Sequence, residues 1–242
     1  MSTTSSLVQK TRPYLALLLT TAGLVVFLGA VGTVSYLLGF TGYLPLVAAF
    51  IPLAAATAIG LTMRRSWRVT GFRRIETRRP GAATAMVLVA ALPIAVIVSS
   101  NGVDAPGVGI LAFAGLAILV GFVEESIFRG ILLRLFSARA PWVGVVATSV
   151  GFAVAHSAAA LSPEQSITES LATIVFAFFF GVIACTLVRM TGSIWPAIAL
   201  HVAFDFSGFV LVPRSAEVTD LVSVAVAAVL AVVLVLVARR HG

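Results

Sequence analysis

A stretch near the middle of the chain combines a membrane-like composition with ionisable side chains. The segment Gly115–Leu133, GLAILVGFVEESIFRGILL, is apolar towards both ends and carries Glu124, Glu125 and Arg129. Each charged residue at the centre of a membrane helix costs about 2.5–3.5 kcal/mol on insertion scales. Three such residues on one segment therefore indicate that they face a protein interior or a wet cavity, where they serve a chemical purpose.

Helical spacing gives the two carboxylates different surroundings. Glu125 and Arg129 are four residues apart, so they share one face of a helix and can form an ion pair. Glu124 is rotated by about 100° around the helix axis and faces another neighbour. We therefore expect Arg129 to hold Glu125 ionised and oriented, and Glu124 to be available for chemistry.

Three further ionisable residues lie within other apolar stretches. His156 follows Phe152 by four residues and Asp205 follows His201 by four, so each pair shares a helix face. The rise of about 1.5 Å per residue places these groups in the cytoplasmic half of the bilayer or near its midplane.

This set of side chains suits the activation of water. Neutral imidazoles bind metals or donate hydrogen bonds, and a desolvated carboxylate can accept a proton from water. A single histidine in a membrane helix is more often a contact between helices, and Phe152 suits the core as well as a site. Purely structural packing seldom needs six such costly groups, so the set as a whole favours a site.

The composition predicts an integral membrane protein. Of the 242 residues, 60% are hydrophobic and 10% are charged, which is too little polar surface to cover a soluble domain of this length. The net charge of +7 is typical of cytoplasmic loops that set membrane topology, so we expect no nucleic-acid partner. The single cysteine, Cys185, excludes an intramolecular disulfide and a multi-cysteine metal site, and we expect it in the core.

The apolar runs predict one all-α membrane domain over residues 1–242, with eight transmembrane helices and both termini in the cytoplasm. A helix needs about 20 residues to cross a bilayer. The predicted spans are Tyr14–Phe40, Tyr43–Met63, Gly81–Ser100, Val108–Phe136, Trp142–Leu161, a sixth that ends near Val188, Ile194–Val212 and Asp220–Arg239. The motif-bearing core covers about residues 108–212.

Local signals mark two of the connections. Asn101–Gly107, NGVDAPG, predicts a turn because it is rich in Gly, Pro and Asp. Before the sixth span, either the Ser, Pro and Gln within residues 162–165 or the pair Ser166 and Glu169 predicts a capped helix start. We therefore assign Glu164 and Glu169 to this helix start rather than to chemistry. The small residues Gly181, Ala184 and Ala197 indicate close packing of helices.

The distribution of basic residues supports this topology. With a cytoplasmic amino terminus, fourteen of the sixteen Lys and Arg residues fall on the cytoplasmic side, Arg214 falls outside and Arg129 lies within a span. Seven of the arginines lie between Arg64 and Pro80, where Glu76 is the single acid. We expect this loop to set the topology and to contact anionic lipid headgroups, with a specific binding role as the alternative.

Three motifs resemble those of the CPBP intramembrane metalloprotease family, which includes CAAX prenyl protease 2, bacteriocin-processing enzymes and lysostaphin-resistance-protein-A-like proteins. EESIFR (Glu124–Arg129), FAVAH (Phe152–His156) and HVAFD (His201–Asp205) are similar to the family motifs in order and spacing. GSIWPAIALH (Gly192–His201) resembles the segment before the third motif. The resemblance covers about Val108–Val212, and the first three spans and the last are not matched.

The resemblance implies an all-helical endopeptidase that opens towards the cytosol and hydrolyses a peptide or membrane-protein substrate. Carried over by position, it implies that Glu124 activates the attacking water and that Glu125 and Arg129 brace the site.

The resemblance also implies the roles of the other three residues. His156 and His201 would coordinate a metal or polarise the water and the oxyanion. With Asp205 they are the candidate ligands of Zn²⁺, and a zinc mechanism and a metal-free glutamate mechanism both stay open. Well-known eukaryotic members have Asn where this chain has Asp205, and the added carboxylate favours a metal, because two His and one carboxylate are adequate zinc ligands.

Two other functions fit the same residues. In a proton-coupled transporter, the acids and histidines would form a relay, although the paired halves typical of transporters are not evident. A catalytically silent scaffold or immunity protein would retain the motifs for structure. High Arg over Lys usage and no organelle targeting signal lead us to expect a bacterial plasma membrane, where the substrate need not be prenylated.

Overall fold

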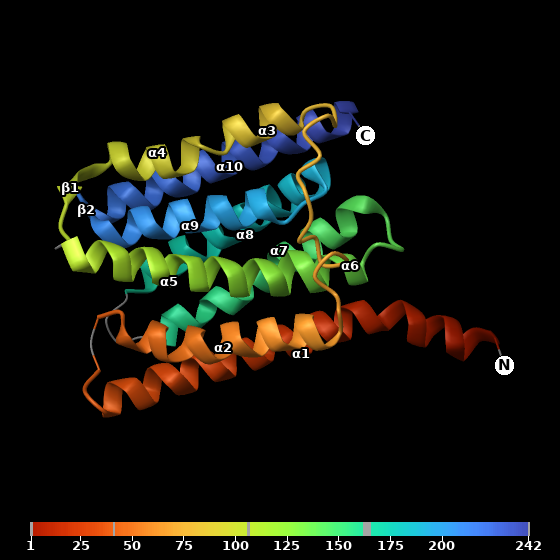
Figure 1. Ribbon diagram of the computed structural model, residues 1–242, viewed down its shortest axis with the longest axis horizontal. Helices are drawn as coiled ribbons and strands as arrows, with labels where there is room; N and C mark the ends of the chain where they lie inside the picture. The colour runs from red at the N-terminus through yellow and green to blue at the C-terminus, as the bar shows by residue number, and fades with distance from the viewer. Residues whose placement is uncertain (1, 41, 106, 162–165, 242) are drawn as a thin grey trace.

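The described residues of a computed structural model are 2–40, 42–105, 107–161 and 166–241. In this part of the chain the helices run roughly side by side in one bundle (Figure 1). Almost no sheet is present among the described residues, and the predicted all-α membrane class is confirmed.

Each predicted span corresponds to one helical rod, and three rods consist of more than one element. The helical elements are α1 Ser2–Leu37, α2 Leu44–Met63, α3 Ala82–Leu88, α4 Ala91–Val98, α5 Gly107–Glu125, the π-helical η1 Ser126–Leu132, α6 Leu133–Leu135, α7 Pro141–Ala155, the 3₁₀-helical η2 His156–Leu161, α8 Ile167–Thr191, α9 Trp195–Val210 and α10 Ala216–His241. The third span comprises α3 and α4, the fourth comprises α5, η1 and α6, and the fifth comprises α7 followed by η2. Pro93 explains the interruption between α3 and α4, because it has no N–H to offer to the carbonyl of Val89.

Five helices in the described part of the chain are long and apolar enough to cross a membrane. They are α1 from Arg12, α2, the α5–α6 rod, α8 and α10. The other three predicted spans are shorter apolar helices, over Ala82–Val98, Trp142–Ala158 and Trp195–Val210. The chain is therefore a multi-pass membrane protein in which two of the shorter apolar helices, Trp142–Ala158 and Trp195–Val210, carry His156 and His201.

The end of the bundle away from the termini has a short sheet that the sequence did not predict. Strands β1 (Ser100–Val103) and β2 (Leu211–Pro213) pair in antiparallel fashion, with Ser100 opposite Pro213 and Val103 opposite Leu211. Part of the predicted turn Asn101–Gly107 is therefore a strand. The pairing fixes the far end of α9 to the connection before α5.

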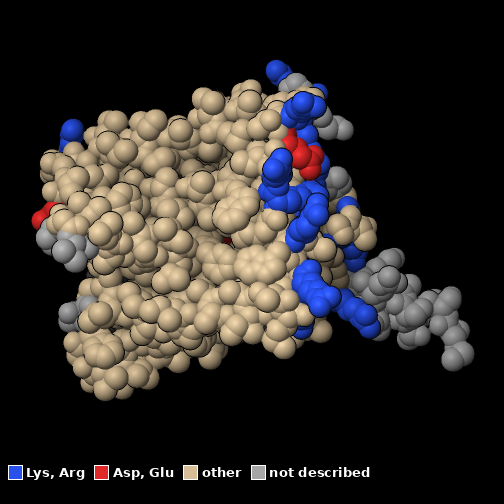
Figure 2. Space-filling model, in the orientation of Figure 1, with Lys and Arg blue, Asp and Glu red and all other residues tan. Residues whose placement is uncertain are grey.

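Both chain ends lie at the opposite, basic end of the bundle (Figure 1). Figure 2 shows most of the visible Lys and Arg side chains gathered at this end. This arrangement agrees with the predicted charge asymmetry and with an even number of spans.

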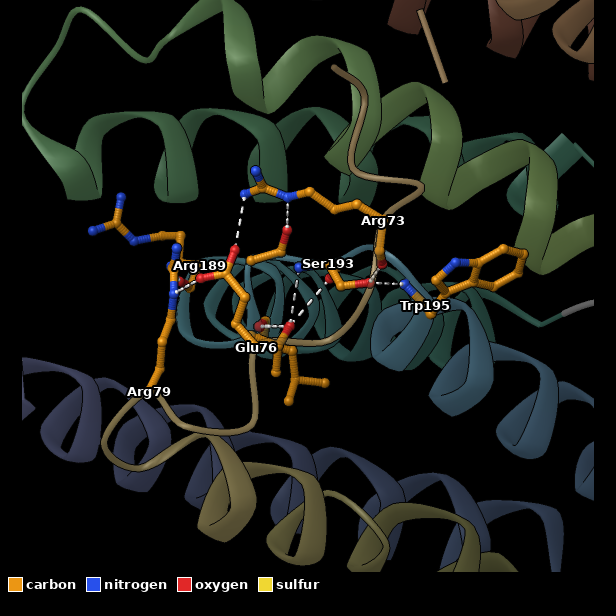
Figure 3. A network of polar contacts seen from close by, with 9 residues as sticks. Arg73, Glu76, Arg79, Arg189, Ser193 and Trp195 are labelled. Carbon is orange, nitrogen blue, oxygen red and sulfur yellow. Dashed lines mark hydrogen bonds and ion pairs between the residues drawn. The ribbon is translucent and has the colours of Figure 1, made fainter. Parts of the chain in front are cut away.

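The arginine-rich loop between α2 and α3 is fastened to the turn between α8 and α9 (Figure 3). Arg73 Nε donates to the carbonyl of Gly192, and the hydroxyl of Ser193 donates to the carbonyl of Arg73 at 2.7 Å. Glu76 forms ion pairs with Arg73 and Arg79, and its backbone N–H donates to Thr191. Gly192 has φ +67°, which favours glycine, and an added Cβ would also lie 2.7 Å from Glu76 Oε1. These contacts fix the start of α9, which carries the third motif.

The predicted close packing at Gly181, the buried position of Cys185 and the helix cap at Ser166 are confirmed. Gly181 allows α8 to approach α7 so closely that an added Cβ would lie 2.9 Å from Ser149 Cα. Cys185 is fully buried in the same core. Ser166 and Glu169 form a capping box at the start of α8, whereas the alternative start within residues 162–165 lies outside the described residues.

Candidate active site

The centre of the site is a buried ion pair on the fourth span. Arg129 Nη1 donates to Glu125 Oε1 at 2.9 Å, and the two side chains are 1% and 0% exposed. The Arg129 guanidinium also lies 4.1 Å from the centre of the Phe152 ring. The pairing predicted from their spacing of four residues is confirmed. It forms even though the chain changes from α-helix to the π-helical η1 directly after Glu125. A π-helical turn inside an α-helix is frequent at functional sites.

His201 on α9 joins this pair to the other carboxylates. Its Nδ1 lies 2.8 Å from Glu125 Oε1. Its Nε2 lies 3.7 Å from Glu124 Oε2 and 3.5 Å from Asp205 Oδ2. The two carboxylates of the first motif and the Asp205 carboxylate of the third motif therefore meet around the His201 imidazole.

His156 contributes from the end of α7. It occupies the transition from α7 to η2, where the helix tightens, and its Nδ1 donates to the carbonyl of Phe152 at 2.9 Å. Its Nε2 lies 3.9 Å from Glu124 Oε2, and its side chain is 28% exposed. Glu124 is thus flanked by the imidazoles of two different helices.

The hydrogen bonds at Nδ1 determine which ring atoms face the centre. A carbonyl oxygen accepts only, so His156 Nδ1 must carry a hydrogen. Glu125 as a carboxylate also accepts only, so His201 Nδ1 carries a hydrogen as well. In both neutral rings the Nε2 atom then has a free lone pair, and both lone pairs lie close to Glu124 Oε2.

Two cavities reach the site from different sides. The larger, of about 390 Å³, lies among α4, α8, α9 and α10 and is lined by His156, His201 and Asp205. The other, of about 330 Å³, lies among α1, α2 and α5 and is lined by Glu124, His156 and Asp205. His156 and Asp205 line both cavities, so these ionisable groups lie between the two spaces.

Glu124 has unused hydrogen-bonding capacity. Its Oε2 atom is buried and has no hydrogen-bond partner within the described chain. An unpaired buried carboxylate oxygen is costly, and a water molecule at this position would satisfy it. The nearest ring nitrogens, at 3.7 and 3.9 Å, are too far from this oxygen for direct hydrogen bonds.

The predicted zinc ligands have the appropriate donor atoms. Both histidines are held through Nδ1 and present Nε2, as histidines that bind metals commonly do, and Asp205 adds an oxygen. Within the ranges that the structure describes, however, no three His, Cys, Asp or Glu side chains are grouped so that they could hold a metal ion. The donor atoms are therefore of the appropriate kind but are not grouped as a three-ligand site in this part of the chain, and zinc stays a prediction.

Two aromatic side chains pack against the histidines of the site, and the sequence indicated only one of them. Phe152 is 2% exposed and contacts the rings of both histidines, with centroid distances of 4.4 Å to His156 and 6.1 Å to His201. Phe180 on α8, also 2% exposed, meets His201 edge-on at 4.9 Å. The spacing of Phe152 from His156 pointed to the first contact, whereas no local signal distinguished Phe180 from other apolar residues of α8.

The comparison with known protein families agrees with the motifs. The model of the type II CAAX prenyl endopeptidase Rce1-like family matches residues 105–207, from the start of α5 to near the end of α9. The predicted family resemblance is confirmed. The matched part contains all six ionisable residues described above but spans less than half of the chain. The match indicates a CAAX-type intramembrane protease. No curated protein matches the chain.

Proposed function

We propose that the protein is an intramembrane endopeptidase in which Glu124 activates a water molecule. The observation that carries this proposal is the convergence of three motifs, from α5, α7 and α9, on one buried carboxylate oxygen without a partner. The family match over residues 105–207 supports peptide hydrolysis as the reaction. The substrate is a peptide or a membrane protein whose scissile bond reaches the space between the two cavities.

In the proposed reaction, Glu124 is the general base and then the general acid. Its carboxylate takes one proton from the water while the water oxygen adds to the carbonyl carbon of the scissile bond. The protonated Glu124 then gives this proton to the departing nitrogen as the C–N bond breaks. The products are a new carboxyl group, which has gained the water oxygen, and a new amine, which has gained the proton that Glu124 took from the water.

The other residues of the site orient the water and balance charge. His156 Nε2 accepts a hydrogen bond from the second O–H group of the water. His201 lies among the carboxylates of Glu124, Glu125 and Asp205, so a positive charge on its ring is balanced, and in that form Nε2 donates to the oxyanion. Arg129 acts through Glu125 by holding the acceptor of His201 Nδ1, and it is therefore a positioning residue.

We further propose a setting for this reaction. The basic end of the bundle would face the cytoplasm, because Lys and Arg concentrate in cytoplasmic loops. The membrane would be a bacterial plasma membrane, with anionic lipids as partners of the arginine-rich loop. The Zn²⁺ prediction is supported here by the donor atoms alone, and no step above depends on a metal.

Cleavage of a peptide library tests the reaction class. The purified protein in liposomes is incubated with membrane-anchored peptides of varied sequence in water enriched in ¹⁸O, and the products are identified by mass spectrometry. We expect cleavage at one peptide bond with ¹⁸O in the new carboxylate, and no product with the His201→Ala variant. Equal cleavage by this variant, or no cleaved peptide in a broad library, would contradict the proposal.

A further inference from the structure

A third cavity lies at the basic end, apart from the two that reach Glu124. It has a volume of about 250 Å³ and lies among the arginine-rich loop, the end of the fourth span, the start of α7 and the end of α8. We call it the arginine cavity, because its lining includes six arginines: Arg73, Arg79, Arg129, Arg134, Arg139 and Arg189. No Asp or Glu is among the described residues that line it.

Two of these arginines have buried N–H groups that nothing in the described chain accepts. Arg129 is 1% exposed, and only its Nη1 is used by Glu125, so Nε and Nη2 have no hydrogen-bond partner. The Nε atom of Arg134 is also buried without a partner. A buried charged donor without an acceptor is costly, and such a group calls for a ligand or ordered water. Both residues line the arginine cavity with part of their side chains.

The charge around the cavity is only partly compensated. Glu76 pairs with Arg73 and Arg79 (Figure 3), and Glu125 pairs with Arg129, whereas the Nε atom of Arg134 has no hydrogen-bond partner within the described chain. A loop that only sets topology needs arginines exposed to water, and it needs neither a cavity nor a buried arginine in its wall. Six guanidinium groups in a concave space, with no carboxylate among the described lining residues, favour an anionic ligand.

We propose that the arginine cavity binds a phosphate group. The planar guanidinium fork matches phosphate oxygens in pairs, and a tetrahedral phosphate offers acceptors in more directions than one carboxylate does. The phosphate could be inorganic or belong to the headgroup of an anionic lipid, since both present the same chemistry at the basic end. This inference concerns binding alone and does not depend on peptide hydrolysis.

Two binding measurements distinguish these sources. In the first, inorganic phosphate is titrated by calorimetry into protein in phosphatidylcholine nanodiscs. In the second, native mass spectrometry counts the phosphatidylglycerol retained by protein from mixed phosphatidylglycerol and phosphatidylcholine nanodiscs. Saturable binding of one equivalent in either arm supports the site, and the arm in which it occurs names the source.

Variants then locate the binding. Arg134→Gln should weaken it about tenfold or more, because one charge-assisted hydrogen bond is worth about 1.5–3 kcal/mol. Arg74→Gln is the matched control, since Arg74 is an exposed arginine of the same loop that does not line the cavity, and it should change binding less than about twofold. Ser137→Glu, at an exposed position in the lining, should abolish binding by placing a carboxylate there without disturbing the core.

Three results would overturn the proposal. They are the absence of saturable binding in both arms, equal losses in Arg134→Gln and Arg74→Gln, and unchanged binding in Ser137→Glu. The second result would mean that the basic face attracts anions without a defined site.

Discussion

The buried pair of Glu125 and Arg129 gives a prediction whose magnitude follows from the structure. Arg129→Met would leave the Glu125 carboxylate, which is 0% exposed, without its guanidinium partner at 2.9 Å. Removing one partner of a buried ion pair costs about 3–5 kcal/mol of folding free energy. The contact of Arg129 with the Phe152 ring is lost as well and contributes about 2 kcal/mol when it is desolvated. We therefore expect a loss towards the upper end of this range.

The double variant Glu125→Gln/Arg129→Met should be more stable than Arg129→Met alone. Replacing both charges by neutral groups removes the uncompensated carboxylate, and the Gln oxygen can still accept from His201 Nδ1. We expect the two substitutions to be coupled by about 2–3 kcal/mol, as measured by reversible unfolding of the four proteins in detergent micelles.

The matched control is the exposed pair of Arg73 and Glu76, which are 3.7 Å apart and both 41% exposed. The same cycle, with Arg73→Met and Glu76→Gln, should give a coupling below about 1 kcal/mol because water screens the pair. Additive effects at Glu125 and Arg129, or an equal coupling at the exposed pair, would refute the reasoning that burial makes this pair interdependent.

Two further predictions concern packing and metal content. Gly181→Ala should destabilise the protein by about 1–3 kcal/mol in the same unfolding assay, since its Cβ would lie 2.9 Å from Ser149 Cα, whereas Gly115→Ala, with open space at this position, should cause no loss. The zinc prediction is tested by elemental analysis of purified protein: one equivalent that is lost in His201→Ala confirms it, and a metal-free parent that hydrolyses peptides contradicts it.

Much of the fold could be predicted from the sequence, because membrane helices have strong local signals. The length of each apolar run determined the helices, and the positions of Lys and Arg determined that both termini lie at one end. The spacing of four residues was sufficient to pair Glu125 with Arg129 and His201 with Asp205. These relations depend only on helix geometry, which varies little from protein to protein.

The parts that could not be predicted depend on contacts distant in sequence. The strand pairing of Ser100–Val103 with Leu211–Pro213 joins segments more than a hundred residues apart, and neither segment alternates strongly enough to be read as a strand. The π-helical turn Ser126–Leu132, most of which is buried, has no local residue signal in the sequence. The fastening of Arg73 and Glu76 to the turn before α9 likewise needed the fold, because an arginine-rich loop alone predicts only contact with lipid and water.

The candidate site illustrates both cases. The six ionisable residues could be selected because each was costly at membrane depth, and the structure brings their side chains together. The support from Phe180 and the unpartnered donors of Arg129 could not be foreseen, because they depend on which helices become neighbours.

The rate of peptide hydrolysis by Glu124→Gln tests the central claim most directly. The substitution keeps the shape of the side chain but removes the base, and general-base catalysis is worth about 10²–10⁴-fold. Glu217→Gln, the same change at an exposed position in the first turn of α10, is the matched control. With both variants folded in the same liposomes, the account predicts that Glu124→Gln retains less than about a hundredth of the rate of Glu217→Gln. Equal rates in the two variants would contradict it.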